Sequence, residues 1–533
     1  MSPRNIQRPE YTLHDLLRNS VERDPGKLAV VDGDAEYSYE DLDRQSSALG
    51  AALVKAGVEK GDRVGVLVEK SWEAIVAMLA ASRIGAAYVN VNPLFKAPQV
   101  EYLAQDCDIR VMIGDTSKLD ELGPKTVETA FYRGEKPQGN AASSYVDVAE
   151  ALRGDGLEED RQVSEIDLCT ILYTSGSTGM PKGVATSQRN VVAGAQIVST
   201  YLENGPEDRI LSALPLNFDA GMSQFTTSLR SGATLYLLRS RLPGDLLKAL
   251  RRYEITGITG VPPLWSLLIR GAKSLRENPL EHLRYLANTG GRIPQANLDE
   301  LRNLLEPAGT KIFLMYGLTE AFRSTYLDPA EIHRSSPEQG NCIGKAIPDT
   351  EILVITKEGK EAAPGERGEL VHRGPTVAMG YWGNEEATAK AYRPNPLAPP
   401  ELLGVERVVY SGDTVTRDKE GYLYFHGRED AMIKNQGYRL SPEEVENLLI
   451  ASGFVNEACA FGVENPAVGH DVIAVISLNN GTDDNTLDKI KEYAINNGPP
   501  YMIPKQIHIQ DELPKTGSGK IDRKAIQNAY TEG

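Results

Sequence analysis

Short apolar runs rich in β-branched residues alternate with amphipathic helical patterns along most of the first 340 residues. Residues 63–68 form a strand pattern, residues 71–84 a helical pattern with Ser71 as its N-cap, and residues 87–91 another strand pattern. A further helix is expected near Ala97 and Pro98, and the alternation returns at 210–214, 221–230, 234–238 and 243–253. This order predicts an α/β fold with mostly parallel sheets covered by helices.

The length and the change in pattern along the chain predict more than one domain. The chain has 533 residues, whereas single cores stop growing at about 250–300 residues. From Cys342, short strand patterns at 351–355, 368–372 and 421–425 predict a β-rich subdomain with a Pro-rich loop at 393–400. The last segment has helical patterns at 442–452 and 487–497 and strand patterns at 472–478 and 506–510. We therefore expect a large N-terminal domain over residues 1–429 and a small, mobile α+β domain over residues 430–533.

Charge and composition exclude several classes of function. The net charge of −17 argues against a nucleic-acid partner and against an anionic membrane surface, since both bind basic proteins. Residues 1–24 are charged throughout, and no apolar window of about 18 residues occurs, so neither a signal peptide nor a membrane span is expected. The four cysteines are far apart and lack metal-ligand spacing, which favours a reducing cytoplasm. The polar stretch 115–144 is expected to be a mobile surface loop.

One loop has the composition of a phosphate-binding segment. Residues 173–183 read YTSGSTGMPKG and follow an apolar run at 169–172. Glycines let backbone N–H groups approach a phosphate, hydroxyls donate further hydrogen bonds and a lysine adds positive charge. The loop is not the P-loop of NTPases, because no Gly-Lys-Ser/Thr sequence ends it. By itself the segment is equally consistent with a flexible Ser/Gly linker.

Five further segments carry residues suited to nucleotide chemistry. An aromatic residue at a strand end can stack on a base, a nearby carboxylate can bind a divalent cation, and an aspartate after a tight turn can accept hydrogen bonds from two ribose hydroxyls. The segments are MYGLTE at 315–320, YSGD at 410–413, GRED at 427–430, IKNQGYR at 433–439 and PKTGSGK at 514–520.

With further matches at 37–42, 85–89, 368–370 and 378–382, these motifs in this order resemble the superfamily of adenylate-forming enzymes. That superfamily comprises acyl-CoA synthetases, luciferases and nonribosomal-peptide adenylation domains, and the resemblance covers nearly the whole chain. It implies an AMP-forming ligase that uses ATP and Mg²⁺. A carboxylate would attack the α-phosphorus of ATP to form an acyl-adenylate and pyrophosphate. A thiol would then take the acyl group and release AMP.

The resemblance also implies a role for individual residues. Catalysis falls to Lys520, Thr319 and Glu320, with Glu320 also holding the metal, and the small domain would rotate about Asp430 between the two half-reactions. That rotation would replace the loop of Lys520 by residues 433–439. The nucleotide would be bound by Thr174, Ser175, Gly176, Ser177, Thr178, Gly179, Lys182, Gly290, Gly291, Tyr316, Gly317, Asp413 and Arg428.

Each of these assignments has an ordinary structural alternative. Lys520 would then be a solvated surface lysine and Asp413 a turn residue. Asp430 would be a cap, and Tyr316 a core residue. The order of the motifs favours the functional assignment for Lys520, Asp413 and Tyr316 more firmly than for Asp430.

The segment LPLNFDAG at 214–221 bears on the substrate. Its Asp219 resembles the aspartate that pairs with the substrate ammonium in amino-acid-activating members, whereas fatty and aryl acid ligases usually show a His-containing segment here. The alternative is that Asp219 caps a helix over 220–230. Arg323 pairs either with a second group of the substrate or with a carboxylate on an outer helix face. The remaining pocket residues implied by the resemblance are mostly small or polar, which disfavours a long fatty chain: Ala220, Ser223, Leu264, Thr289, Met315 and Ser324.

One residue departs from the family pattern. Many members carry a histidine where this chain has Gln188, and the sequence does not decide how this change affects the local packing or access to the acyl pocket. No carrier domain follows Lys520 in this sequence, so the expected acceptor is the phosphopantetheine thiol of a separate carrier protein. Two alternatives remain: an AMP-forming acyl-CoA ligase with CoA as the acceptor, and a non-catalytic homologue. The second is disfavoured by the presence of Lys520, Glu320 and Asp413.

Overall fold

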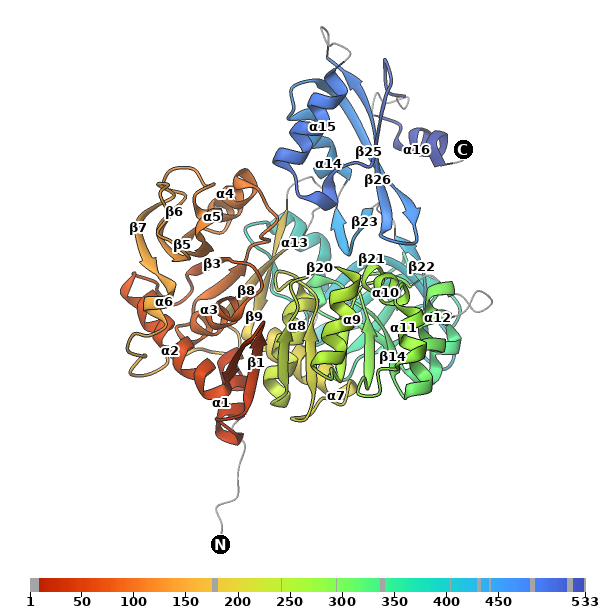
Figure 1. Ribbon diagram of the computed structural model, residues 1–533. Coiled ribbons are helices and arrows are strands. Elements are labelled where there is room, and N and C mark those ends of the chain that lie inside the picture. Colours follow the sequence, from red (N-terminus) through yellow and green to blue (C-terminus); the bar gives the residue numbers. More distant parts are fainter. Residues whose placement is uncertain are drawn as a thin grey trace.

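The chain folds around two large β-sheets, with a third, smaller sheet standing above them (Figure 1). The computed structural model describes residues 9–174, 181–240, 242–293, 295–335, 341–402, 404–428, 433–440, 442–479, 485–514 and 521–531. Among the described helices, none is both long enough and apolar enough to cross a lipid bilayer.

The largest sheet changes from parallel to antiparallel along its length. Strands β1, β11, β10, β12, β13 and β14 pair in parallel, and the pairings from β14 to β15 and onward are antiparallel. The β-rich subdomain expected from Cys342 is this antiparallel part. In spatial order the strands are β17 (Glu351–Ile355), β18 (Arg367–Arg373), β21 (Arg407–Arg417), β22 (Leu423–Arg428), β16 (Cys342–Ala346), β15 (Thr325–Leu327), β14 (Lys311–Tyr316), β13 (Tyr285–Asn288), β12 (Gly257–Gly260), β10 (Arg209–Ser212), β11 (Thr234–Leu237), β1 (Leu28–Asp32) and β2 (Ala35–Ser38), with β20 (Tyr392–Pro394) beside β21.

The second sheet is parallel except at one edge, where β8, β9 and β19 pair antiparallel. Its strands in order are β19 (Gly380–Tyr381), β9 (Lys182–Ser187), β8 (Leu168–Thr174), β4 (Ala87–Asn90), β3 (Arg63–Leu67), β5 (Ile109–Asp115), β6 (Val127–Arg133) and β7 (Ala142–Asp147). The expectation of a mobile loop over 115–144 is wrong, because β6 pairs with both β5 and β7 there. Its apolar Val127, Ala130 and Phe131 are buried among polar neighbours that hid the strand pattern.

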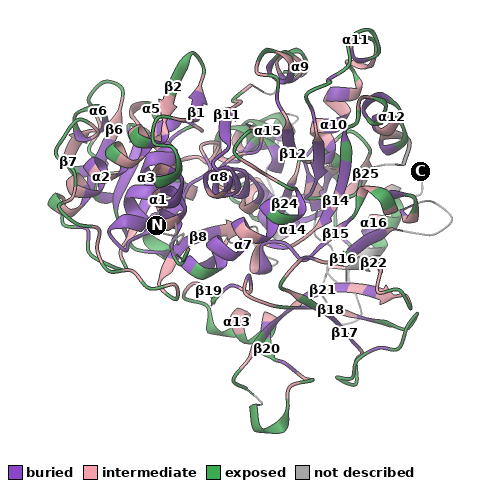
Figure 2. Ribbon diagram, turned by 90° about the horizontal axis from the view of Figure 1, so that it is seen from below, coloured by how far each residue is buried: buried purple, intermediate pink, exposed green. Residues whose placement is uncertain are grey.

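Helices pack between and around these two sheets. The almost wholly apolar α3 is buried on nearly every side, in a core that also takes side chains from β1 of the first sheet and β3 of the second (Figure 2). The helices of the large domain are α1 (Leu13–Arg23), α2 (Tyr39–Lys55), α3 (Trp72–Arg83), α4 (Ala97–Asp106), α5 (Thr116–Leu119), α6 (Val148–Ala151), α7 (Gln188–Tyr201), α8 (Asp219–Ser231), α9 (Pro243–Arg252), α10 (Pro262–Ile269), α11 (Ala272–Glu277), α12 (Gln295–Leu305) and α13 (Glu385–Ala391), with short 3₁₀ segments η1 (Glu306–Ala308), η2 (Thr319–Ala321), η3 (Pro329–Arg334) and η4 (Pro400–Leu402).

The small domain is an α+β unit with its own core. Helices α14 and α15 and strands β26 and β27 lie where the sequence patterns predict them, whereas β25 was not anticipated. Its elements are β23 (Ile433–Asn435), β24 (Tyr438–Leu440), α14 (Pro442–Ile450), β25 (Val455–Asn465), β26 (Gly469–Leu478), α15 (Thr486–Asn497), η5 (Pro500–Met502), β27 (Gln506–Ile509) and α16 (Arg523–Thr531). The predicted α/β fold class is confirmed. The predicted domain boundary falls at residues 429–432, outside the described residues, and stays a prediction.

Helix α8 lies unusually close to the segment that leads into it. A Cβ atom on Gly221 would stand 1.9 Å from the carbonyl oxygen of Pro215. Backbone atoms cannot move aside as a flexible side chain can, so only glycine fits here. This contact sets how the first turn of α8, with Asp219, is presented.

We predict that Gly221→Ala lowers the thermal midpoint, because an overpacked core position costs about 1–3 kcal/mol. Gly26→Ala is the matched control, since a Cβ atom there meets nothing within 4 Å. Equal midpoints for the two variants would contradict the close packing of α8 on Pro215.

Two buried histidines are held neutral. Burial lowers the pKa of His372 to about 3 and that of His14 to about 4. The ring nitrogens of His372 hydrogen-bond the hydroxyls of Ser324 and Thr376, each at 3.0 Å. Because these pKa values lie below the unfolded value of about 6.5, the unfolded chain takes up the protons first. The stability that the neutral rings contribute is complete above pH 6.5 and is lost as the pH falls from 6.5 towards these folded values.

We predict that His372→Gln narrows the difference in thermal midpoint between pH 7.5 and pH 5.0. The wild-type ring loses about 1.4 kcal/mol of stability per pH unit as the pH falls from 6.5 to 5.0, and glutamine does not titrate. The comparison variant His282→Gln removes a histidine whose side chain is 56% exposed, and the narrowing should be larger in His372→Gln than in this variant. If His372→Gln left the difference unchanged, His372 would titrate alike in the folded and unfolded chain.

Candidate active site

A cavity of about 440 Å³ opens where the carboxyl ends of several parallel strands meet the small domain. Its walls include the end of β8 and segments that directly follow β10, β12, β13 and β14, together with the first turn of α8 and helix α10. Ligands of open α/β sheets bind outside the carboxyl ends of the strands, where loops can approach them. The small domain closes the cavity with residues 436–439, 467–468 and 501–502.

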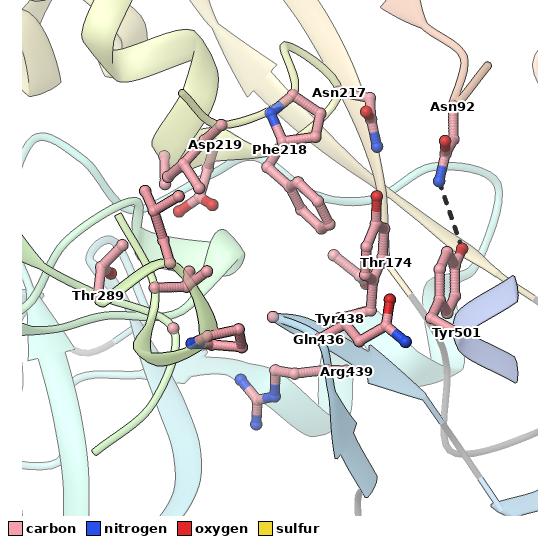
Figure 3. Close-up of a pocket in the computed structure, with 18 of the residues that line it drawn as sticks. Asn92, Thr174, Asn217, Phe218, Asp219, Thr289, Gln436, Tyr438, Arg439 and Tyr501 are labelled. Atoms are coloured by element: carbon pink, nitrogen blue, oxygen red, sulfur yellow. Dashed lines mark hydrogen bonds between the residues drawn. The ribbon is translucent and has the colours of Figure 1, made fainter. Parts of the chain in front are cut away.

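An ion pair lies in the wall of this cavity. Nη1 of Arg323 donates to Oδ2 of Asp219 at 2.8 Å, and the two side chains are 3% and 16% exposed. Asp219 is the first residue of α8, whose N-cap is Phe218. Its carboxylate points into the open space of the cavity (Figure 3). Thus Asp219 and Arg323, which the sequence assigned separately to the pocket, contact each other.

Arg323 reaches the cavity by a tight turn. Phe322 has φ of 63° and ψ of −68°, and the Arg323 N–H donates to the carbonyl of Ala321 at 2.7 Å. These values describe a γ-turn with positive φ, which is rare and strained. Gly317 makes room for it, because a Cβ atom there would lie 3.0 Å from Cα of Arg323. The strain is held by the surrounding packing, including the buried Phe322 ring against Gly194.

Three of the residues expected at the nucleotide and metal site lie in two hydrogen-bonded pairs. The hydroxyl of Tyr316 donates to the carboxylate of Asp413, across the strands β14 and β21. The hydroxyl of Tyr381 donates to Oε1 of Glu320 at 2.6 Å. The Nζ atom of Lys182 lies 5.6 Å above the ring of the same tyrosine. Tyr381 therefore connects the end of the phosphate loop with the carboxylate expected to hold the metal.

Aromatic side chains join the small domain to the rim of the cavity. Tyr438 stacks on Tyr501, with ring centroids 3.6 Å apart, and packs against Phe218 of the large domain at 4.7 Å. Nδ2 of Asn92 donates to the Tyr501 hydroxyl at 3.4 Å (Figure 3). Phe218 directly precedes Asp219, so docking of the small domain is coupled to the wall that carries the ion pair.

The loop between β23 and β24 inserts into the cavity from the small domain. Gly437 has φ of 84°, and a Cβ atom on it would meet a methyl group of Val261 at 3.2 Å. This is part of the segment 433–439 that the resemblance assigns to the second half-reaction. The expected rotation itself stays a prediction.

The structure brings many of the predicted site residues to one cavity and leaves others elsewhere. Those lining it are Thr174, Asp219, Ala220, Leu264, Thr289, Gly290, Gly317, Thr319 and Arg323. Ser223, Met315 and Ser324 are buried but do not line it. Four further residues do not line the cavity but are neighbours of lining residues: Gly291, Tyr316 and Glu320 in sequence, and Lys182 by its pairing with Thr174. Asp413 lies one step further away, because it is hydrogen-bonded to Tyr316.

Other assignments fall on residues whose structure is not described. Strand β22 pairs Arg428 with Asp413 along the backbone, but the Arg428 side chain lies outside the described part. The same holds for the whole of Ser175, Gly176, Ser177, Thr178, Gly179, Asp430 and Lys520. All of these roles stay predictions.

Gln188 has a structural role away from the cavity. Its Oε1 atom accepts hydrogen bonds from the Leu13 N–H at 2.9 Å and the Ser82 hydroxyl at 3.3 Å. The side chain thereby satisfies the first turn of α1. Access to the cavity is not affected by this departure from the family pattern, because Gln188 does not line it.

Sequence reasoning missed the aromatic contacts and Tyr381. Tyr381 lies in the matched segment 378–382, so its motif was seen but its bond to Glu320 was not. Phe218 was seen only as the neighbour of Asp219. Tyr501 and Asn92 had no signal in the sequence, because they contact each other although they lie 409 positions apart in the chain.

A relative of similar length and a peptide synthase both match nearly the whole chain. The L-proline–[L-prolyl-carrier protein] ligase of Pseudomonas fluorescens is 30% identical over 522 residues, covering 96% of this chain and 98% of that protein. Bacitracin synthase 3 of Bacillus licheniformis is 28% identical over 97% of this chain. The chain spans only 8% of that synthase's length.

A solved structure shares the fold. The o-succinylbenzoate CoA synthetase of Bacillus subtilis, crystallised as a double mutant with a product analogue, superposes with a TM-score of 0.81 at 24% identity. The match covers 96% of this chain and 98% of that chain.

Two family models match the chain. The model of the AMP-binding enzyme matches residues 17–382, and that of the AMP-binding enzyme C-terminal domain matches residues 444–520. The resemblance inferred from the order of the motifs is therefore confirmed. The chain belongs to the AMP-binding enzyme family.

Proposed function

We propose that this enzyme activates a small amino acid with ATP, as an acyl-adenylate, and transfers it to the phosphopantetheine thiol of a separate carrier protein. The observation that carries this proposal is the shared cavity. It joins the Asp219 carboxylate, the phosphate-loop residue Thr174 and the small-domain residue Gly437. The half-buried carboxylate of Asp219 offers a partner for a substrate ammonium, which offsets the cost of desolvating both.

The relatives support the same reading. The Pseudomonas fluorescens protein, by its name, ligates L-proline to a carrier protein, and it matches this chain over nearly its full length. AMP-forming ligation with CoA as the thiol remains the alternative, because the cavity residues do not by themselves distinguish the two acceptors. The four cysteines are all free and buried, which supports a reducing compartment such as the cytoplasm.

In this proposal each residue binds, orients or neutralises charge. Thr319 would contact the α-phosphate and, with the backbone near Gly317, would face the reacting carboxylate, since both residues line the cavity. Tyr316 would stack on the base, and Asp413 would accept hydrogen bonds from the ribose hydroxyls. The residues fit Mg²⁺, because one carboxylate plus phosphate oxygens is its usual ligand set with nucleotides. The described residues offer Glu320 but no cluster of three acidic, histidine or cysteine ligands. When bound, the cation would neutralise phosphate charge, while Tyr381 orients the Glu320 carboxylate.

The function is tested by ATP–pyrophosphate exchange over amino acids and their analogues without the amine. The proposal expects exchange with at least one amino acid, and loss of exchange with its deaminated analogue. Release of AMP should then depend on a phosphopantetheinylated carrier protein rather than on free CoA. Fastest exchange with fatty or aryl acids, with CoA as the accepting thiol, would establish the CoA ligase alternative instead.

We predict that Lys520→Ala reduces pyrophosphate exchange by at least a hundredfold while thiol transfer from a supplied acyl-adenylate is nearly unchanged. A charge that faces the substrate in only one arrangement of the small domain affects only the step made in that arrangement. Lys505→Ala, which removes a lysine paired with Asp471 on the small-domain surface, is the control. Normal exchange by Lys520→Ala would remove this residue from the first half-reaction.

We predict that Gly437→Ala slows thiol transfer more than pyrophosphate exchange. The added methyl group would press on Val261 only when the small domain is docked as it is here. Gly453→Ala matches it in backbone strain, because Gly453 has φ of 80° but no neighbour within 4 Å of an added Cβ atom. The two half-reactions should be measured separately. Equal losses in both would indicate that this docked arrangement does not belong to thiol transfer.

A further inference from the structure

The guanidinium of Arg323 has hydrogen-bonding capacity that the protein does not use. Nη1 donates to Asp219 and to the carbonyl of Phe322, at 2.8 and 2.7 Å. Its Nε and Nη2 atoms are buried and have no hydrogen-bond partner among the described residues. Leaving a buried donor unpaired costs about 1–3 kcal/mol, and more for a charged group. Such a group in a cavity wall is suited to an acceptor supplied by a ligand.

The backbone that positions Arg323 is strained. The positive-φ γ-turn at Phe322 directly precedes Arg323, which is buried, and a Cβ atom on Gly317 would lie only 3.0 Å from Cα of Arg323. An arginine needed only to neutralise Asp219 could act from an unstrained site. Strained turns of this kind persist where the surrounding structure over-determines them, and they cluster at ligand sites.

The charge balance of this ion pair then restricts the substrate. Asp219 and Arg323 together carry no net charge. The ammonium of an amino acid at Asp219 would leave the pair with one uncompensated positive charge, since Arg323 already shares that carboxylate. A second carboxylate on the same substrate restores neutrality and gives Nε and Nη2 a bidentate partner, which is the geometry in which arginine binds carboxylates best.

We infer that the substrate is an amino-dicarboxylic acid, whose ammonium binds Asp219 and whose side-chain carboxylate binds Nε and Nη2 of Arg323. The inference rests on the proposed function and refines it, because it specifies the side chain of the amino acid. The α-carboxylate remains free to react near Thr319, which lines the same cavity. Arg323 is a specificity-determining residue that discriminates a charged acceptor from a neutral or apolar side chain.

The test compares matched substrates in one enzyme. Pyrophosphate exchange is measured with aspartate, glutamate and 2-aminoadipate, with the amides asparagine and glutamine, with norvaline, and with succinate and glutarate, which lack the amine. We expect one of the three acidic amino acids to have the highest kcat/KM. The kcat/KM of this acid should exceed that of its amide and apolar counterparts at least tenfold. The diacid without an amine should have a kcat/KM as low as those of the amide and the apolar amino acid.

Variants locate the selectivity. Arg323→Gln should lower the ratio of acidic to amide substrate at least tenfold, whereas Arg323→Lys should retain part of it. The control Arg302→Gln removes an arginine that also pairs with a carboxylate, Glu306 at 2.7 Å, but on the surface of α12. Thermal midpoints with and without the preferred acid give a readout that does not depend on turnover. If Arg323→Gln does not fold, the ratio of kcat/KM for the acid to that for its amide in the wild-type enzyme still decides the question.

The outcomes separate this inference from the proposed function. The inference would be overturned if a neutral amino acid supported exchange and the acidic amino acids were tenfold slower. It would also be overturned if the acidic amino acids were no faster than their amides. Either result would leave the proposed function standing. Exchange confined to acids without an amine would overturn both. Unchanged selectivity in Arg323→Gln would also overturn the role of Arg323.

Discussion

The ion pair between Asp219 and Arg323 joins two parts of the molecule that the chain brings together over a long distance. Asp219 begins α8, which packs in the helical layer between the two sheets, and Arg323 follows β14 of the first sheet. Removing one partner of a buried ion pair costs about 3–5 kcal/mol of stability, because the other charge is left unpaired. Helix α8 and the end of β14 must therefore be positioned so that the two side chains meet. Gly221 against Pro215 and Gly317 against the turn at Phe322 are the close contacts that allow this.

The arrangement of the cavity follows from the topology. Parallel strands end at the same edge of a sheet, so loops that are far apart in sequence converge there. The small domain then adds the loop around Gly437 and the stacked pair of Tyr438 and Tyr501. Because Tyr438 also contacts Phe218, docking of the small domain bears directly on the helix that carries Asp219.

Much of the fold could be predicted, because it depends on local periodicity. The helix expected at 71–84 is α3, and the strand expected at 351–355 is β17. Ser71 stands at the N-cap position of α3 but forms no capping hydrogen bond through its side chain. Strand β6 was missed because its buried face is short and its neighbours are polar, a case in which tertiary pairing overrides local pattern.

The sequence predicted which segments form the candidate site, but it did not predict which side chains in them contact each other. Ordered motifs located Thr174, Thr319 and Asp219, and the cavity contains all three. No local pattern indicates that Arg323, 104 positions from Asp219, would pair with it. The sequence left two partners open for Arg323, a substrate group or a carboxylate on an outer helix face. The structure pairs Nη1 of Arg323 with the half-buried carboxylate of Asp219, next to the unusual backbone of Phe322, and leaves Nε and Nη2 for a substrate group.

If Asp219 and Arg323 act as one unit in substrate binding, the effects of substituting them do not add. A double-mutant cycle of Asp219→Asn and Arg323→Gln, followed by kcat/KM in pyrophosphate exchange with the preferred amino acid, measures their coupling. Residues in contact show interaction energies of about 0.5–3 kcal/mol, and we expect a coupling energy of at least about 1 kcal/mol. Effects that add within about 0.3 kcal/mol would contradict it, because the two side chains would then act on the substrate independently.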